Sequence, residues 1–390
     1  GRRSRLARRG READRHRPRA APPPPPPPPP PRPSAAGGGG AAAPPAPPPA
    51  AELLIDGAAG TVTVDPDQAL ALAAVADYRA TATRNARWTG PGATSDGHRV
   101  EILANVQDGA GARAAAETPA EGIGLFRTEL CFLDRDGEPS VQEQAGIYRA
   151  VLDAYPAAKV VIRTLDAGSD KPLRFADHPE EANPALGVRG IRIAARDSGI
   201  LDRQLDAIAA ASAGRAAPPL VMAPMIATVG EARAFASKVR GRGLIAGVMI
   251  EVPAAALLAD AILAEVDFVS IGTNDLAQYT MAADRMSPDL AALTDPWQPA
   301  VLALVARTAA AGRRTGKPVG VCGEAAADPL LACVLTGLGV TSLSAAAPAV
   351  AGVGAQLAAV TLAECESAAA AVLEATAPHD ARERARRILH

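Results

Sequence analysis

Short apolar runs alternate with longer alanine-rich stretches along most of the chain after residue 98. The short runs have the length and composition of buried strands, and the longer stretches between them can form helices. The predicted strands are Val100–Val106, Gly122–Arg127, Val160–Asp166, Leu220–Met225, Ile245–Glu251, Phe268–Gly272, Val319–Cys322 and Ser342–Ala346. Eight such units predict an α/β fold, a (β/α)8 TIM barrel, over residues 99–375. A doubly wound open sheet is the alternative, although no glycine-rich phosphate loop follows any of the strands.

The pattern before the barrel is different. Residues 51–66 contain two apolar runs around a Gly-Ala-Ala-Gly turn and predict a β-hairpin, and residues 67–88 have the spacing of a linker helix. Residues 1–50 are rich in Arg, Pro and Gly and cannot bury a core, so we expect a disordered tail there. That tail is either a basic or proline-rich tether, or upstream sequence wrongly read as protein. Residues 376–390 are expected to be a C-terminal tail.

Charge separates the same two parts of the chain. Residues 1–50 contain ten arginines and two acidic residues, whereas the rest has 30 basic and 40 acidic side chains. The acidic body has no basic stripe that would indicate a nucleic-acid partner. The segment from Pro329 to Ala363 has no charged residue, but glycines and prolines interrupt it. We therefore expect a buried helix, a strand and the start of a helix there, and no membrane span.

The spacing of the cysteines indicates the cellular compartment of the protein. Cys131, Cys322, Cys333 and Cys365 lie far apart and form no CxxC pair. This spacing favours reduced thiols over disulfides or a zinc site. No apolar segment of a secretory signal follows the arginine-rich start. The expected location is the cytoplasm.

Charged side chains stand where several predicted strands end. Arg127 and Arg163 end two strands, and guanidinium groups bind phosphate and carboxylate through paired hydrogen bonds. Glu251 and Asp275 follow two neighbouring strands and offer the hard oxygen ligands that Mg²⁺ prefers. The alternatives are structural ion pairs for the arginines and helix-capping carboxylates for the acids.

Two further residues are candidates for chemistry. Cys322 ends a strand just before Gly323, a position that suits proton transfer, although most buried cysteines are inert. Asn274 stands beside Asp275 and is either a ligand or a helix cap. Cys333 and Cys365 lie within Ala/Leu helices and fit the inert interpretation.

Six stretches carry the candidate residues: EGIGLFRTEL (121–130), VIRTLDAGSDKP (161–172), NPALGVRGIR (183–192), MIEVPAAALLAD (249–260), IGTNDLAQYTMAADR (271–285) and GVCGEAAADP (320–329). Together they resemble Enzyme I of the phosphoenolpyruvate-dependent sugar phosphotransferase system. The resemblance covers roughly residues 51–375, and the RTLD-x-G-x-DK sequence favours Enzyme I over pyruvate phosphate dikinase and phosphoenolpyruvate synthase.

The resemblance implies roles for individual residues. Glu251 and Asp275 match the family's Mg²⁺ ligands, and Cys322 matches its general acid, which protonates enolpyruvate. The residues that match substrate-binding or supporting positions are Arg127, Arg163, Asn274, Arg285, Lys171 and Arg189. The resemblance also implies a homodimer formed by the barrel. The charge pattern and the interrupted uncharged segment predict no nucleic-acid or membrane partner.

The N-terminal part departs from the family pattern. Family members carry a phosphohistidine domain with a Thr-Ser-His segment and a helical domain that docks the phosphocarrier protein HPr, and none of the five histidines here has that context. Residues 51–66 resemble only the last hairpin of the phosphohistidine domain. The resemblance therefore implies an N-terminally truncated Enzyme I, a Mg²⁺-dependent phosphotransferase whose acceptor histidine comes from another chain. The alternatives are a noncatalytic phosphoenolpyruvate-binding or dimerisation module, and a truncated gene model.

Overall fold

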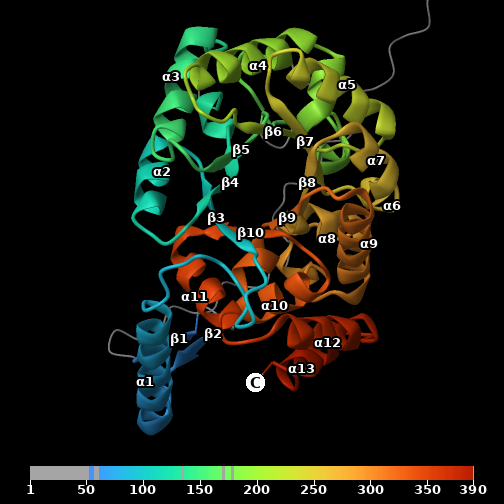
Figure 1. Cartoon of the computed structure of the whole chain (residues 1–390). Helices are drawn as coiled ribbons and strands as arrows, with labels where there is room; N and C mark the ends of the chain where they lie inside the picture. Colours follow the sequence, from blue (N-terminus) through green and yellow to red (C-terminus); the bar gives the residue numbers. More distant parts are fainter. Residues whose placement is uncertain (1–51, 57–60, 134, 169–171, 177–179, 390) are drawn as a thin grey trace, which may run out of the picture. The chain divides into compact units, whose positions relative to one another are not determined.

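A computed structural model describes residues 52–56, 61–133, 135–168, 172–176 and 180–389 of the chain (Figure 1). The chain divides into two compact units, Gly1–Ala71 and Leu72–His390. The expected tail over residues 1–50 lies outside the described residues. All four cysteines are free and buried.

The described part of the first unit contains a β-hairpin. Strands β1 (Leu53–Asp56) and β2 (Thr61–Val64) pair antiparallel, with Leu53 opposite Val64 and Asp56 opposite Thr61. Helix α1 (Gln68–Asn85) follows and has no fully buried residue. The predicted hairpin and linker helix are thus both present.

The second unit contains a closed barrel of eight parallel strands, which confirms the predicted fold (Figure 1). The strands are β3 (Glu101–Val106), β4 (Gly122–Arg127), β5 (Lys159–Arg163), β6 (Leu220–Ala223), β7 (Ile245–Ile250), β8 (Phe268–Gly272), β9 (Val319–Cys322) and β10 (Ser342–Ala346). Each pairs with its sequence neighbours, and β10 closes the barrel against β3. The predicted strands over 160–166 and 220–225 end earlier, so Asp166 and Met225 lie in loops beyond β5 and β6.

Helices cover the outside of the barrel. They are α2 (Gly109–Ala116), α3 (Val141–Leu152), α4 (Ser198–Ser212), α5 (Val229–Arg240), α6 (Pro253–Leu257), α7 (Ala259–Glu265), α8 (Thr273–Met281), α9 (Pro299–Thr315), α10 (Pro329–Gly337), α11 (Ala347–Leu357) and α12 (Leu362–Leu373). Their buried faces are mainly Ala, Leu, Ile and Val, which fits a chain with 3% aromatic residues. Capping boxes at Ser140, Thr228 and Thr361 begin α3, α5 and α12.

The C-terminal segment is more ordered than expected. Residues 376–390 were expected to be a tail, but helix α13 (Pro378–Arg386) lies there, with Ala381 and Ala385 fully buried. The uncharged segment forms α10, β10 and α11, as predicted. Among the described residues no single helix is long and apolar enough to cross a membrane; one pair, α11 with α12, passes on length and composition but is bent by 105°.

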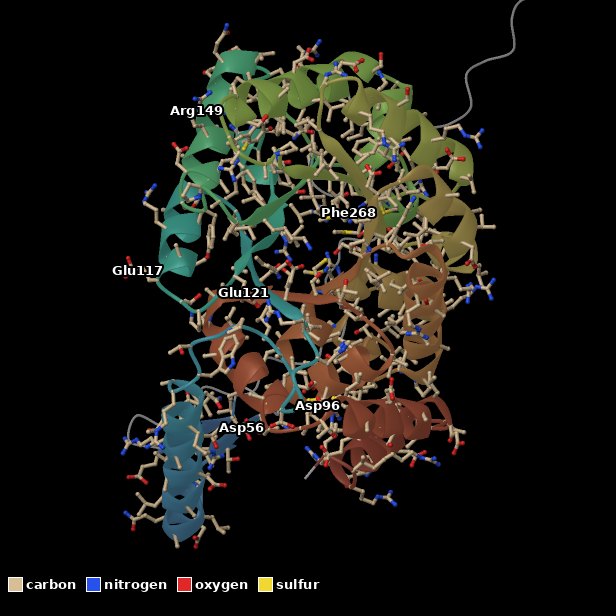
Figure 2. The ribbon with its side chains drawn as sticks, in the orientation of Figure 1. Asp56, Asp96, Glu117, Glu121, Arg149 and Phe268 are labelled. Carbon is tan, nitrogen blue, oxygen red and sulfur yellow. The ribbon has the colours of Figure 1, made fainter. Side chains whose placement is uncertain are left out.

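The barrel interior is filled by side chains. Its cluster consists of Leu125, Val161, Met222, Met249, Phe268 and Cys322. Phe268 comes from β8 (Figure 2). An ideal Cβ on Gly247 would lie 2.3 Å from the ring of Phe268, so glycine at this position leaves room for the ring. The packed interior closes the barrel from below and leaves the carboxyl ends of the strands to form a site.

Candidate active site

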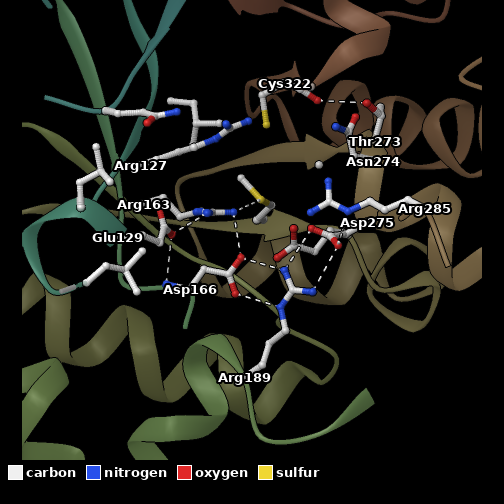
Figure 3. A pocket seen from close by; sticks show the side chains of 18 residues that line it. Arg127, Glu129, Arg163, Asp166, Arg189, Thr273, Asn274, Asp275, Arg285 and Cys322 are labelled. Carbon is white, nitrogen blue, oxygen red and sulfur yellow. Dashed lines mark hydrogen bonds and ion pairs between the residues drawn. The ribbon is translucent and has the colours of Figure 1, made fainter. Parts of the chain in front are cut away.

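A cavity of about 240 Å³ lies at the carboxyl ends of the barrel strands (Figure 3). The predicted residues that line it are Arg127, Arg163, Arg189, Glu251, Asn274, Asp275, Arg285 and Cys322. These residues come from segments separated by almost 200 positions, and parallel strands bring them to one mouth. Lys171 lies outside the described residues, and the role of each predicted residue stays a prediction.

Arg163 is the centre of a buried ionic network. Its Nη2 lies 2.6 Å from Oε1 of Glu129, and its Nη1 lies 3.1 Å from Oδ2 of Asp166. Glu129 belongs to the 3-10 helix η1 (Glu129–Cys131), directly after β4. Burial lowers the pKa of Arg163, but the charges of Glu129, Asp166 and Glu251 raise it by more, so the guanidinium stays protonated.

Arg189 joins two carboxylates. Its Nε and Nη2 donate to the two oxygens of Asp166 at 3.1 and 2.9 Å, and its Nη1 and Nη2 donate to those of Asp275 at 3.3 and 3.2 Å. Nη1 also donates to the Tyr279 hydroxyl at 3.2 Å, and that hydroxyl donates to the carbonyl of Ala185. Arg189 therefore fixes the loop after β5 against the start of α8.

Glu251 is 1% exposed and lies among like charges. Burial raises its pKa to about 8, the charges of Asp166 and Asp275 add to this rise, and Arg163 opposes it. Its Oε1 accepts a hydrogen bond of 2.6 Å from the backbone N–H of Met225. Met225 has φ 61, in the left-handed region, and this backbone conformation places its N–H at the site.

Arg285 and Arg127 are less neutralised by carboxylates than Arg163 and Arg189 are. Nε of Arg285 is 4.0 Å from Oδ1 of Asp275, and the side chain is 33% exposed. Arg127 has neither an ion pair nor a side-chain hydrogen bond within the described part of the chain, although it lines the cavity. These two guanidinium groups retain donors that an anion could use.

The thiol of Cys322 lies at the edge of the cavity and is 2% exposed. It donates to the carbonyl of Ile271 at 3.5 Å and accepts from the hydroxyl of Ser270 at 3.6 Å. Burial raises the pKa of this thiol, whereas the Ser270 hydrogen bond and the charge of Arg163 lower it. The net rise keeps Cys322 protonated at neutral pH.

Asn274 is held by the segment after β9. Its Nδ2 donates to Oε1 of Glu324 at 3.5 Å, and its Oδ1 accepts from the backbone N–H of Glu324 at 3.1 Å. The intervening Gly323 has φ 104, and an ideal Cβ there would lie 2.7 Å from Oγ1 of Thr273. Glycine is therefore required between the thiol and the loop that holds Asn274.

The metal prediction rests on charge. No group of three or more His, Cys, Asp or Glu in the described ranges has the arrangement of a metal site. The oxygens of Glu251 and Asp275 are nevertheless hard ligands, and the pKa of Glu251 is raised by burial and, beyond that, by the negative charges of Asp166 and Asp275. A divalent cation would relieve that repulsion, so the donor set fits Mg²⁺.

Sequence reasoning missed Glu129 and Asp166 as site residues. Each follows a predicted arginine by two or three positions, in Arg127-Thr-Glu129 and Arg163-Thr-Leu-Asp166. A carboxylate two or three residues after an arginine at a strand end is the signal in the sequence that indicates both residues.

Comparison with known proteins gives consistent matches. The family model described as PEP-utilising enzyme, PEP-binding domain, matches residues 82–362. A phosphoenolpyruvate-protein phosphotransferase of Streptomyces coelicolor is 53% identical over 340 residues, which cover 86% of this chain and 61% of that protein. A multiphosphoryl transfer protein of Rhodobacter capsulatus is 43% identical over 341 residues, covering 85% of this chain and 41% of that protein.

A third relative agrees. A phosphoenolpyruvate-protein phosphotransferase of Haloferax volcanii is 40% identical over 342 residues, covering 83% of this chain and 59% of that protein. The chain thus spans 61% or less of the length of these three relatives.

Proposed function

This chain belongs to the phosphoenolpyruvate-utilising enzymes, and from that premise we propose that its barrel binds phosphoenolpyruvate and transfers the phosphoryl group to a protein histidine, releasing pyruvate. The observation that carries the proposal is the pair of guanidinium groups, Arg127 and Arg285, on a cavity whose deeper arginines, Arg163 and Arg189, are already paired with carboxylates. A small ligand with two anionic ends fits such a cavity. Phosphoenolpyruvate has a phosphate at one end and a carboxylate at the other.

The proposed binding of phosphoenolpyruvate uses the guanidinium donors that Arg127 and Arg285 retain. Arg127 and Arg285 are proposed to bind the anionic groups with charge-assisted hydrogen bonds, and Asn274 to donate through its amide. Arg163 and Arg189 are proposed to hold in place the carboxylates that line the cavity around the ligand. Lys171 is proposed as a further supporting cation.

We propose Mg²⁺ as the cofactor, with Glu251 and Asp275 as its protein ligands. When bound, the cation would supply positive charge to the phosphate and enolate oxygens. The residues of this chain are proposed to hold the ligand in place, to exclude water and to supply the proton that the product needs.

The proposed transfer is an in-line displacement. An imidazole nitrogen attacks phosphorus, the P–N bond forms, and the bond from phosphorus to the enol oxygen breaks. The resulting enolpyruvate needs a proton on its methylene carbon, which the protonated thiol of Cys322 donates. None of the described residues that line the cavity is a histidine, so the acceptor is proposed to come from another domain or another chain.

The wider assignment follows the named relatives. We propose that the chain is the barrel part of a sugar phosphotransferase Enzyme I, works with a phosphohistidine domain and HPr, forms a homodimer through the barrel and acts in the cytoplasm. The relatives' names support phosphoryl transfer to a protein, and the remaining relations rest on the resemblance of the sequence motifs to Enzyme I.

Calorimetric titration tests the binding half of the proposal. Phosphoenolpyruvate is titrated into the chain with and without Mg²⁺, and binding is expected to be tighter with the cation. The Arg127→Ala variant serves as the weakened control. An absence of heat at millimolar phosphoenolpyruvate in both buffers would refute the assignment.

Turnover tests the chemical half. Pyruvate release is measured after a phosphohistidine domain of an Enzyme I is supplied in trans. Release that depends on this domain supports the transfer reaction. Binding without release would identify the chain as a noncatalytic phosphoenolpyruvate-binding module.

A further inference from the structure

Ser270 lies beneath the proposed acid. It belongs to β8, is 6% exposed, and its hydroxyl donates to the sulfur of Cys322 across 3.6 Å. In the parallel pairing of β8 with β9, Ser270 stands opposite Gly320 and Gly272 stands opposite Cys322. Side chains two positions apart on a strand share a face, so Ser270 and Cys322 both face the barrel interior.

The sulfur is held from two sides at rest. The thiol proton points to the carbonyl of Ile271, and the lone pairs face the hydroxyl of Ser270. Leu125, Val161 and Met249 belong to the same buried cluster and supply no strong hydrogen-bond donor. Once Cys322 loses its proton, the Ser270 hydroxyl is the neutral donor already placed to stabilise the thiolate.

We propose that Ser270 is a positioning residue that fixes the Cys322 sulfur below the cavity and stabilises the thiolate formed when the enolate is protonated. This inference rests on the proposed function, because it assigns Ser270 to the proton step of that reaction. It adds a residue that does not line the substrate cavity and acts only through the thiol.

Charged groups also face the sulfur. Arg163 from β5 and Arg127 from β4 lower the pKa of the thiol, and Glu251 beyond β7 raises it. These groups remain in a Ser270→Ala variant, so that variant isolates the hydroxyl. The expected consequence is a thiolate that forms only at higher pH.

The first measurement is the pH dependence of alkylation of Cys322 by iodoacetamide, with the modified peptide identified by mass spectrometry. Ser270→Ala should move the midpoint upward by about one to two pH units. Ser342→Ala is the matched control, because Ser342 is also a 6% exposed barrel serine and no hydrogen bond joins it to Cys322 in the described structure. An unmoved midpoint in Ser270→Ala, with a normal thermal melt, would overturn the proposal.

The second measurement needs no phosphoryl acceptor. In D₂O with Mg²⁺, the thiolate removes a proton from the methyl group of pyruvate: the C–H bond breaks, an S–H bond forms and the electron pair moves to the carbonyl oxygen. The thiol exchanges with solvent, and a deuteron returns to carbon. Proton NMR follows the loss of the methyl signal.

Three variants distinguish the role of Ser270 from the role of Cys322 in the proposed function. Cys322→Ala should abolish exchange, Ser270→Ala should slow it about tenfold or more near neutral pH, and Ser342→Ala should match the parent. Normal exchange in Ser270→Ala, together with its loss in Cys322→Ala, would refute the role of Ser270 and leave the proposed function intact. If the parent shows no exchange, the role of Cys322 in the proposed function fails, and alkylation alone decides whether Ser270 controls the thiol.

Discussion

The arginines of the cavity fall into an inner and an outer pair. The inner pair, Arg163 and Arg189, is 10% and 6% exposed at the side chain, and each guanidinium contacts two carboxylates. In the outer pair, Arg285 is 4.0 Å from its nearest carboxylate oxygen, and Arg127 has no ion pair within the described residues. The inner pair therefore builds the site, and the outer pair has charge available for a ligand.

The two pairs also differ in charge balance. Around the inner arginines stand the carboxylates of Glu129, Asp166, Asp275 and Glu251. Burial is the main reason why the pKa of Glu251 is raised, and the surplus of four carboxylates over two guanidinium groups adds to this rise. The inner layer, which consists of the inner arginines and these carboxylates, is thus suited to bind a cation. The outer layer, which consists of Arg127 and Arg285, is suited to bind an anion.

The largest effect is expected from Arg163→Ala. This change leaves the buried carboxylate of Glu129 without its guanidinium partner and takes one of two guanidinium partners from Asp166, so it should lower the free energy of unfolding by about 3–5 kcal/mol. Urea unfolding followed by circular dichroism measures it. Arg314→Ala is the control, because its ion pair with Asp260 has side chains 58% and 52% exposed. The Arg314→Ala variant should lose at most about 1 kcal/mol. Equal losses in both variants would show that the buried ion pairs of Arg163 contribute no more to stability than an exposed one.

The next effect is a pH dependence that arises from Glu251. Its pKa is raised to about 8 in the folded chain, above its unfolded value, so the folded state binds more protons between these two values. Stability should therefore fall as pH rises through this window, by on the order of 3 kcal/mol. Unfolding at pH 5 to 8 in EDTA measures the fall.

Two comparisons test the cause of this pH dependence. Glu251→Gln should flatten the curve, because the amide does not ionise. Mg²⁺ should restore stability at pH 8, since it binds the ionised form. A parent curve that is flat, or that rises with pH, would show that burial and the neighbouring carboxylates do not hold Glu251 neutral.

Arg127→Ala tests the outer pair. It should weaken phosphoenolpyruvate binding by about 1.5–3 kcal/mol, roughly ten- to a hundredfold, because a charge-assisted contact is lost. Its free energy of unfolding should change by less than about 0.5 kcal/mol, since no buried partner is left behind. Calorimetry and urea unfolding on the same sample separate the two. A stability loss as large as that of Arg163→Ala would show that the outer arginines support the fold as much as the inner arginines do.

The sequence predicted the barrel and the position of the site because both follow from local patterns. Strand runs such as Gly122–Arg127 and Phe268–Gly272 were predicted with their observed bounds, and residues at their ends necessarily meet at one mouth. Arg127 and Arg163 looked equivalent, because each ends a strand. Their difference depends on Glu129 and Asp166, whose distances to a guanidinium are set by loop conformation.

Other features depend on long-range contacts. Arg189 reaches Asp275 across 86 positions, and Tyr279 reaches Ala185 across 94. No spacing in the sequence indicates these pairs. The helix over Pro378–Arg386 was missed because its buried residues are the small Ala381 and Ala385 in a charged segment, which gives a weak apolar pattern.

The smallest effect is expected from Tyr279→Phe, which removes only a hydroxyl from the inner layer. That hydroxyl accepts from Arg189 at 3.2 Å and donates to the carbonyl of Ala185. Its loss should cost about 1 kcal/mol of stability, since the ion pairs of Arg189 remain. Tyr155→Phe is the matched control, because the buried hydroxyl of Tyr155 has no hydrogen-bond partner among the described residues. Urea unfolding should show little loss or a gain for Tyr155→Phe, as an unpaired buried polar atom is removed. If the two variants behave alike, the Tyr279 hydroxyl does not support Arg189, and the inner layer is held by its ion pairs alone.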